Sequence, residues 1–229
     1  MLSFKEFTSV YGARFLELYF LYRSIFTDKN EAENFDGINA GLELNSNKQL
    51  QKQYGKFKEC WVAAIEDGKV IGGINYTVFK IPSLDITTAH INYLFTLKEY
   101  RGKGIGTSLV NHIKETSNPK YIFCEQNDPE KMSPEEIQEH LKSSGISAEA
   151  RNEWWAMRGF VKLNFTYIQP PLTEDDDFAT GMFLSSCPAT TDVKVVKEHL
   201  RRFFYISVLK GRTFNDPQIE QLIDCIKEE

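Results

Sequence analysis

The chain has 229 residues, of which 41% are hydrophobic and 13% aromatic, enough to bury the core of one large domain or of a domain with a small appendage. The formal net charge of −5 gives no general case for binding nucleic acid or a membrane surface. The four cysteines are scattered without a CxxC pair, the first residues lack the pattern of a secretory signal, and no apolar stretch could span a bilayer. We therefore expect reduced thiols, no metal site and a cytoplasmic protein.

The first third of the chain predicts a helix, a polar segment and a β-hairpin. Apolar residues recur every three or four positions over residues 4–26, the spacing of an amphipathic helix. Residues 28–58 are polar and predict a loop with one or two short helices. Residues 59–80 predict two strands joined by Asp67-Gly68, a dipeptide that favours a tight hairpin turn.

The rest of the chain alternates strand and helix patterns and ends in a helical tail. We expect strands at residues 89–97, 121–126, 161–168 and 179–186, and helices at 107–116, from Ser133 onward, at 149–159, and in a tail at 192–209 and 216–226. This order predicts an α/β (α+β) protein with a mixed, mostly antiparallel sheet flanked by helices. We expect one domain at 1–185 and a helical C-terminal extension at 186–229 packed on it.

The segment RGKGIG, residues 101–106, is the most glycine-dense in the chain and joins a predicted strand to a predicted helix. A Walker A loop needs GxxxxGK[ST], but here the lysine, Lys103, precedes the last glycine. A dinucleotide-binding GxGxxG needs a glycine where Ile105 or Thr107 stands. A turn without a ligand is the plain alternative, although three alternating glycines cost much backbone entropy for an ordinary turn.

The spacing Arg101-x-x-Gly104-x-Gly106 instead suits a loop whose successive main-chain N–H groups face a pyrophosphate. The N-terminus of the helix from Thr107 adds partial positive charge at the same point. Arg101 and Lys103 at the rim of the loop can meet the outer phosphate charges. The loop therefore predicts a site for a diphosphate group.

This loop resembles motif A of the Gcn5-related N-acetyltransferase (GNAT) superfamily, in which [Q/R]-x-x-G-x-[G/A] holds the pyrophosphate of acetyl-CoA. A second segment, RNEWWAMRGFVKLNFTYIQPPL at residues 151–172, is similar to the helix and final strand of the superfamily, and in detail to a bacterial branch of uncharacterised substrate. The resemblance covers residues 60–172 well. It implies the GNAT acyl-CoA N-acyltransferase fold, with acetyl-CoA as co-substrate.

The resemblance also implies direct transfer of the acetyl group from the CoA thioester to an amine, with Leu94 to Thr96 pairing to the pantetheine arm. The superfamily often places a glutamate base where this chain has Asn92, which cannot take a proton. His90, two residues earlier on the same side of the strand, is one substitute, or else a packing histidine. Glu125 at the end of the next strand is the other: a base, a partner for the positive charge of the amine, or a solvated side chain.

Trp155 stands where many relatives have a tyrosine acid, and an indole N–H donates a hydrogen bond without delivering a proton. Trp154 and Trp155 are expected to wall the acyl and pantetheine channel, or to belong to the core. Asn152 is a pantetheine or substrate contact, or an exposed helix residue. Arg151 holds a CoA phosphate or pairs with the glutamate. Cys124 adjoins the site, but nothing nearby activates it for a covalent route.

The sequence thus predicts an acetyl-CoA-dependent N-acetyltransferase acting on the primary amine of a small molecule, with a protein amine as the lesser option. Two alternatives stay open: a longer acyl-CoA or a hydroxyl acceptor, and a catalytically weak CoA-binding regulatory domain. We expect no nucleic-acid or membrane partner, a monomer or homodimer, acceptor specificity from residues 27–58, and a tail that covers the acceptor side or forms a dimer contact. The catalytic candidates are Glu125, His90 and Asn92. The cofactor-binding candidates are Leu94, Phe95, Thr96, Arg101, Gly102, Lys103, Gly104, Ile105, Gly106, Thr107, Asn152 and Trp155.

Overall fold

A computed structural model describes residues 1–27, 32–174 and 176–227 of the chain. In these residues a seven-stranded sheet has the order β1-β2-β3-β4-β5-β7-β6. The strands are β1 (Leu2–Phe7), β2 (Phe57–Glu66), β3 (Lys69–Ile81), β4 (Ile86–Thr96), β5 (Tyr121–Asn127), β6 (Val161–Lys162) and β7 (Met182–Cys187). β4 and β5 run parallel, and the other neighbours are antiparallel. The expected mixed, mostly antiparallel sheet is confirmed.

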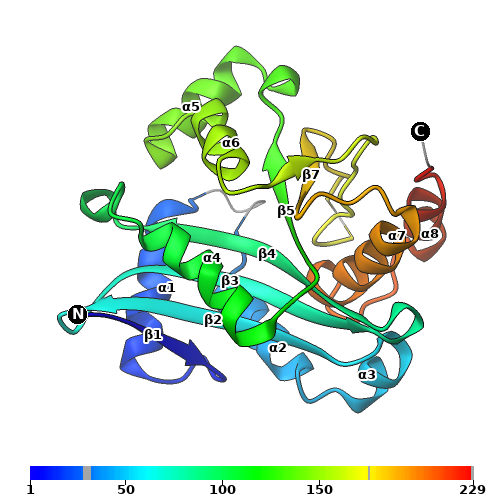
Figure 1. Cartoon of the computed structure of the whole chain (residues 1–229), viewed down its shortest axis with the longest axis horizontal. Coiled ribbons are helices and arrows are strands. Elements are labelled where there is room, and N and C mark those ends of the chain that lie inside the picture. The colour runs from blue at the N-terminus through cyan, green and yellow to red at the C-terminus, as the bar shows by residue number, and fades with distance from the viewer. Residues whose placement is uncertain (28–31, 175, 228–229) are drawn as a thin grey trace.

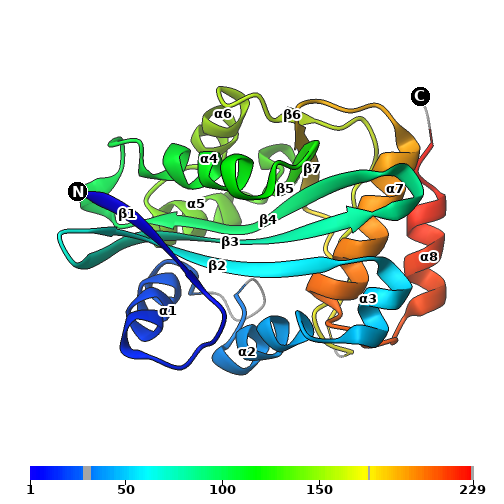
Figure 2. The same cartoon turned by 60° about the horizontal axis from the view of Figure 1, so that its bottom comes forward.

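Helices cover both faces of the sheet, with α4 and α6 on one side and α1 and α2 on the other (Figures 1 and 2). The helices are α1 (Ala13–Ile25), α2 (Phe35–Leu44), α3 (Lys48–Tyr54), α4 (Ile105–Ser117), α5 (Pro134–Ser144), α6 (Ala148–Ala156), α7 (Val193–Arg202) and α8 (Asp216–Asp224). α7 continues into a π-helical segment, Phe203–Val208. Short 3₁₀ turns lie at Pro82–Leu84, Lys98–Tyr100 and Pro129–Lys131. None of the helices in the described residues is long and apolar enough to cross a membrane.

Local signals in the sequence place several of these elements correctly. Asp67 and Gly68 both have positive φ, 48° and 79°, as the two central residues of a tight hairpin between β2 and β3 require. Ser133 caps α5 and forms a reciprocal capping box with Glu136. The hairpin turn and the start of α5 therefore lie where the turn and cap residues predict them.

Two expectations about secondary structure are wrong. The helix predicted over residues 4–26 is wrong at its start: residues 4–7 belong to β1, which pairs with β2 over Trp61–Glu66, and α1 begins only at Ala13. The strand expected at 161–168 is confined to β6, because the chain then leaves the sheet and buries Leu163 and Tyr167 in the core. Part of the segment 27–58 and of the acidic turn at 174–178 lies outside the described residues.

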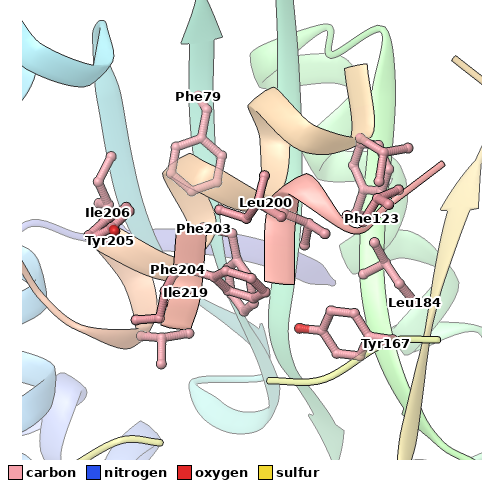
Figure 3. Close-up of a cluster of buried hydrophobic side chains, with 14 of the residues drawn as sticks. Phe79, Phe123, Tyr167, Leu184, Leu200, Phe203, Phe204, Tyr205, Ile206 and Ile219 are labelled. Atoms are coloured by element: carbon pink, nitrogen blue, oxygen red, sulfur yellow. The ribbon is translucent and has the colours of Figure 1, made fainter. Parts of the chain in front are cut away.

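The C-terminal segment fills the core at the end of the sheet where β4 and β5 are paired. Figure 3 shows part of a buried hydrophobic cluster, in which Phe203 and Phe204 of the π-helical segment lie together with Phe123 of β5 and Tyr167. Phe123, Phe203 and Phe204 are at most 2% exposed. Burial of this much aromatic surface makes the segment part of the hydrophobic core, and it places α7 side chains directly behind β4 and β5.

Candidate active site

The glycine loop lies between β4 and α4 and uses its glycines for two different reasons. Gly102 and Gly104 have φ of 76° and 82°, the left-handed region in which side chains are strained, and Gly104 is the residue before α4. Gly106 is needed for space, because a Cβ there would lie 3.0 Å from Cζ2 of Trp154. The first N–H groups of α4 have no acceptor within the helix, so this end of the helix can bind an anion.

Arg158 lies beside this helix terminus, and sequence reasoning gave it no role. Its Nε and Nη2 donate to Oγ1 of Thr107 at 2.9 and 2.7 Å, and its guanidinium carbon lies 3.5 Å from the centroid of a Trp154 ring. The residue directly precedes the Gly159-Phe160 pair of the second motif, which was the available signal. A planar cation held at a helix N-terminus adds to the positive potential there.

The two cations predicted at the rim of the loop contact other parts of the protein in this structure. Arg101 donates from Nη1 to the main-chain oxygen of Ser144 at 2.7 Å, which ties the loop to the end of α5. The ammonium of Lys103 lies 4.5 Å from the ring centroid of Tyr100. Their roles toward a phosphate stay predictions.

The sheet opens between β4 and β5 next to the glycine loop. The two strands pair only from Thr88–Ile91 against Tyr121–Cys124. The register between β3 and β4 shifts by one residue at the same level, and Asn92 is the extra residue of this bulge. Leu94, Phe95 and Thr96 therefore keep β3 on one side and have an edge without a β5 partner on the other. Such an edge offers main-chain donors and acceptors to an extended ligand.

The bulge residue Asn92 is held by a chain of amides. Nδ2 of Asn75 donates to the main-chain oxygen of Cys60 at 3.1 Å and to Glu59 at 3.2 Å, so its Oδ1 is left to accept from Nδ2 of Asn92 at 2.8 Å. Among the described residues, Oδ1 of Asn92 is buried and finds no hydrogen-bond partner. The amide orientation follows from this network, and it leaves an unpaired acceptor at the level where the sheet opens.

Glu125 is the first residue of β5 beyond the part that pairs with β4, and its side chain is 15% exposed. The hydroxyl of Tyr167 donates to its Oε1, and Nε2 of His90 lies 3.8 Å from its Oε2. Burial and the carboxylate raise the pKa of Tyr167 well above its usual value, so the phenol stays a donor. His90 is fully buried, and burial lowers its pKa although Glu125 opposes the change.

Comparison with known proteins supplies the family. Residues 17–130 match the family described as the acetyltransferase (GNAT) family. The chain belongs to the GNAT superfamily. A Bacteroides thetaiotaomicron protein assigned to the GNAT family has 17% identity and a TM-score of 0.59, with 92% of this chain and 99% of that one covered. Arabidopsis thaliana Naa50 in complex with the bisubstrate analogue CoA-Ac-MVNAL has 16% identity and a TM-score of 0.50, with 81% and 97% covered. At these identities the structural likeness concerns the fold. No curated protein matches the sequence.

The remaining predicted site residues lie on α6. Trp155 is half-buried and packs edge-on against Phe160, with ring centroids 4.8 Å apart. Asn152 donates to the main-chain oxygen of Asn127, the last residue of β5. Arg151 contacts Ser144 and His140 near the end of α5.

Cys124 is buried in the hydrophobic cluster between the sheet and α4. Its thiol is buried, contacts the hydroxyl of Ser185 at 3.2 Å, and burial raises its pKa to about 12. A thiol of that pKa is a poor nucleophile at neutral pH, which agrees with the weak expectation for a covalent route. Within the described ranges, no group of three or more His, Cys, Asp or Glu side chains is placed to hold a metal ion.

Sequence reasoning missed Tyr167 and His199, besides Arg158. Tyr167 follows β6 in irregular chain, and His199 is one buried position on α7. Tyr167 lies within the second quoted segment, 151–172, but sequence reasoning gave it no role, and His199 lies outside both motifs. Both come to Glu125 or His90 through tertiary packing.

Proposed function

We propose that this GNAT protein is an acetyl-CoA-dependent N-acetyltransferase that transfers the acetyl group directly to the primary amine of a small molecule. The observation that carries the proposal is the opening of β4 from β5 beside the glycine loop. The loop and the start of α4 would bind the pyrophosphate, with the guanidinium of Arg158 close by. The free edge of Leu94 to Thr96 would pair with the pantetheine arm. Asn152 and Trp155 would border that arm from α6.

Where the amine would bind, the protein offers a base and an oriented hydrogen-bond acceptor. In the proposed reaction Glu125 takes the proton of the incoming ammonium, directly or through a water molecule, while Oδ1 of Asn92 accepts a second N–H of the amine. The C–N bond forms as the C–S bond breaks, and a main-chain N–H of the free edge stabilises the oxyanion. The departing thiolate is protonated by water, because Trp155 is no acid and Tyr167 is held by Glu125.

The burial of these groups favours a compact acceptor. Oδ1 of Asn92 is buried and Glu125 is only 15% exposed, so the reacting amine has to enter a confined space. A small-molecule amine meets this condition more easily than a lysine on a folded protein surface. A carboxylate at this place also favours a cationic amine over a neutral hydroxyl acceptor.

Binding of the donor is tested by thermal denaturation with acetyl-CoA, longer acyl-CoAs and free CoA. At 100 times the dissociation constant, a specific ligand should raise Tm by roughly 5–10 °C. The substitution Gly106→Val should abolish the shift, because its side chain would occupy the space next to Trp154. Gly181→Ala is the matched control, since an added methyl group there meets nothing within 4 Å. No shift with any CoA compound in the unmodified protein would refute the proposal.

Catalysis is tested separately, by measuring CoA release with a panel of primary amines. The catalytically weak regulatory alternative rests on Asn92 and Trp155 in place of the usual base and acid. It predicts the same thermal shift but no release of CoA above the hydrolysis background with any acceptor. A rate that depends on acetyl-CoA and on one amine supports the enzyme.

A further inference from the structure

Two histidines contact each other in the core directly behind Glu125. His90 belongs to β4, and His199 belongs to α7, outside the residues 17–130 matched by the family. Nδ1 of His90 lies 3.0 Å from Nε2 of His199, and Nδ1 of His199 lies 2.9 Å from Oγ1 of Thr88. His90, His199 and Thr88 are all 0% exposed. These contacts form a line from Thr88 to His90, and Nε2 of His90, which has no hydrogen-bond partner among the described residues, lies 3.8 Å from Oε2 of Glu125.

The contacts select one arrangement of protons along this line. A carboxylate only accepts, so the nitrogen of His90 that faces Glu125, Nε2, is the one that carries its proton. Nδ1 of His90 then has a lone pair and accepts from Nε2–H of His199. Nδ1 of His199 accepts in turn from the hydroxyl of Thr88. The reverse arrangement would direct a lone pair of His90 at the carboxylate.

Both rings are kept neutral by their surroundings. The ring of His90 stacks on Phe203 and that of His199 on Phe123, with centroids 3.5 and 3.9 Å apart. Burial lowers the pKa of both histidines; for His199 the neighbouring His90 and Arg202 lower it further, and for His90 the carboxylate of Glu125 acts in the opposite direction. Neutral rings can be fixed in one tautomer by their partners.

The line ends in the core rather than at solvent. Thr88 is fully buried, so a proton taken up at Glu125 has no outlet through His90 and His199. The pair therefore suits orientation of a dipole, and the proton itself leaves Glu125 by the opposite, partly exposed side. At 3.8 Å the N–H of His90 acts on the carboxylate as an oriented dipole rather than as a short hydrogen bond.

We propose that His199 is a positioning residue of the active site: it holds His90 in the Nε2–H tautomer, so that the His90 N–H faces Glu125 and stabilises its carboxylate form. The C-terminal segment thereby completes the catalytic site from outside the matched family region. The consequence for turnover rests on the proposed role of Glu125 as the base. The tautomer itself can be measured without any substrate.

The tautomer is tested by two-bond ¹H–¹⁵N correlation spectra of the protein at pH 7.5. The chain has only four histidines, so each spin system can be assigned by substitution. His90 should show a protonated Nε2 and an unprotonated Nδ1. His199→Phe, which keeps a flat ring, should release His90 into a mixture of tautomers, whereas His199→Gln, whose amide can donate to Nδ1, should keep Nε2–H. His112→Phe, on α4, is the control that removes one spin system and leaves His90 unchanged.

Turnover of the same variants separates positioning from folding. His199→Phe should lower kcat about fivefold, the value of one oriented donor. His199→Gln should restore most of the rate, and KM for acetyl-CoA should not move in either. An Nδ1–H tautomer of His90 in the unmodified protein, or an unchanged spectrum in His199→Phe, would overturn the proposal. So would a tautomer change without a change in kcat. Absence of transfer by the unmodified protein would count against the proposed function, and the spectra would still decide the tautomer.

Discussion

Replacing Glu125 by glutamine should lower kcat by about 10²–10⁴-fold and leave the affinity for acetyl-CoA nearly unchanged. The amide keeps the size of the side chain and can still contact Tyr167, but it cannot take a proton from an ammonium. Asn92, the polar side chain at the bulge of β4, cannot replace it as a base, because an amide takes no proton. His90 cannot do so either, because the proton on Nε2 occupies the nitrogen that faces the site.

The measurement is the rate of CoA release as a function of amine concentration, with the acetyl-CoA thermal shift recorded for the same variant. Glu115→Gln makes the same chemical change on an exposed position of α4 and should leave both quantities unchanged. A Glu125→Gln variant within threefold of the unmodified rate would rule out Glu125 as the base. Survival of the rate in His90→Ala as well would leave water as the proton acceptor.

The elements that could be predicted from sequence are those fixed by local chemistry. The hairpin follows from Asp67-Gly68, and α4 from its glycine loop and from the apolar spacing of Leu109, Val110 and Ile113, all at most 2% exposed. β1 could not be found in this way. Its residues are paired with Trp61–Glu66, far along the chain, and taken alone they join smoothly to the helical pattern that follows.

The same distinction holds within the site. The glycine loop lies in one short motif, and Glu125 is placed by its position after a predicted strand, so sequence reasoning could name both. The bulge at Asn92 depends on how β3 pairs with β4, and no residue type in the sequence indicates it. His199 lies in a segment of alternating charge and apolar residues, where a buried histidine is indistinguishable from an exposed one until the helix is docked on β4.

The buried histidine pair also predicts how stability depends on pH. In the unfolded chain each histidine has a pKa near 6.5, and in the folded protein burial lowers the pKa of both, so below pH 6.5 the unfolded state binds more protons. The free energy of unfolding should therefore fall between pH 6.5 and 5.5, by about 1 kcal/mol for each histidine that stays neutral when folded. The charged and titratable groups around the pair are Glu125 on β5, Arg202 on α7, and Tyr167 in the irregular segment after β6.

Urea denaturation at pH 7.5, 6.5 and 5.5 measures this dependence, and His199→Phe isolates the contribution of one ring. The variant should lose about half of the acid-dependent decrease, whatever its stability at pH 7.5, because the slope reports the difference in bound protons. The buried carboxyl of Glu59 has the opposite sign: burial raises its pKa, so it takes up a proton more readily in the folded state. Since Glu59 is present in both proteins, its effect cancels in the comparison. Equal slopes would show that His199 is charged in the folded protein, and a charged His199 would donate from both nitrogens and could not accept from Thr88.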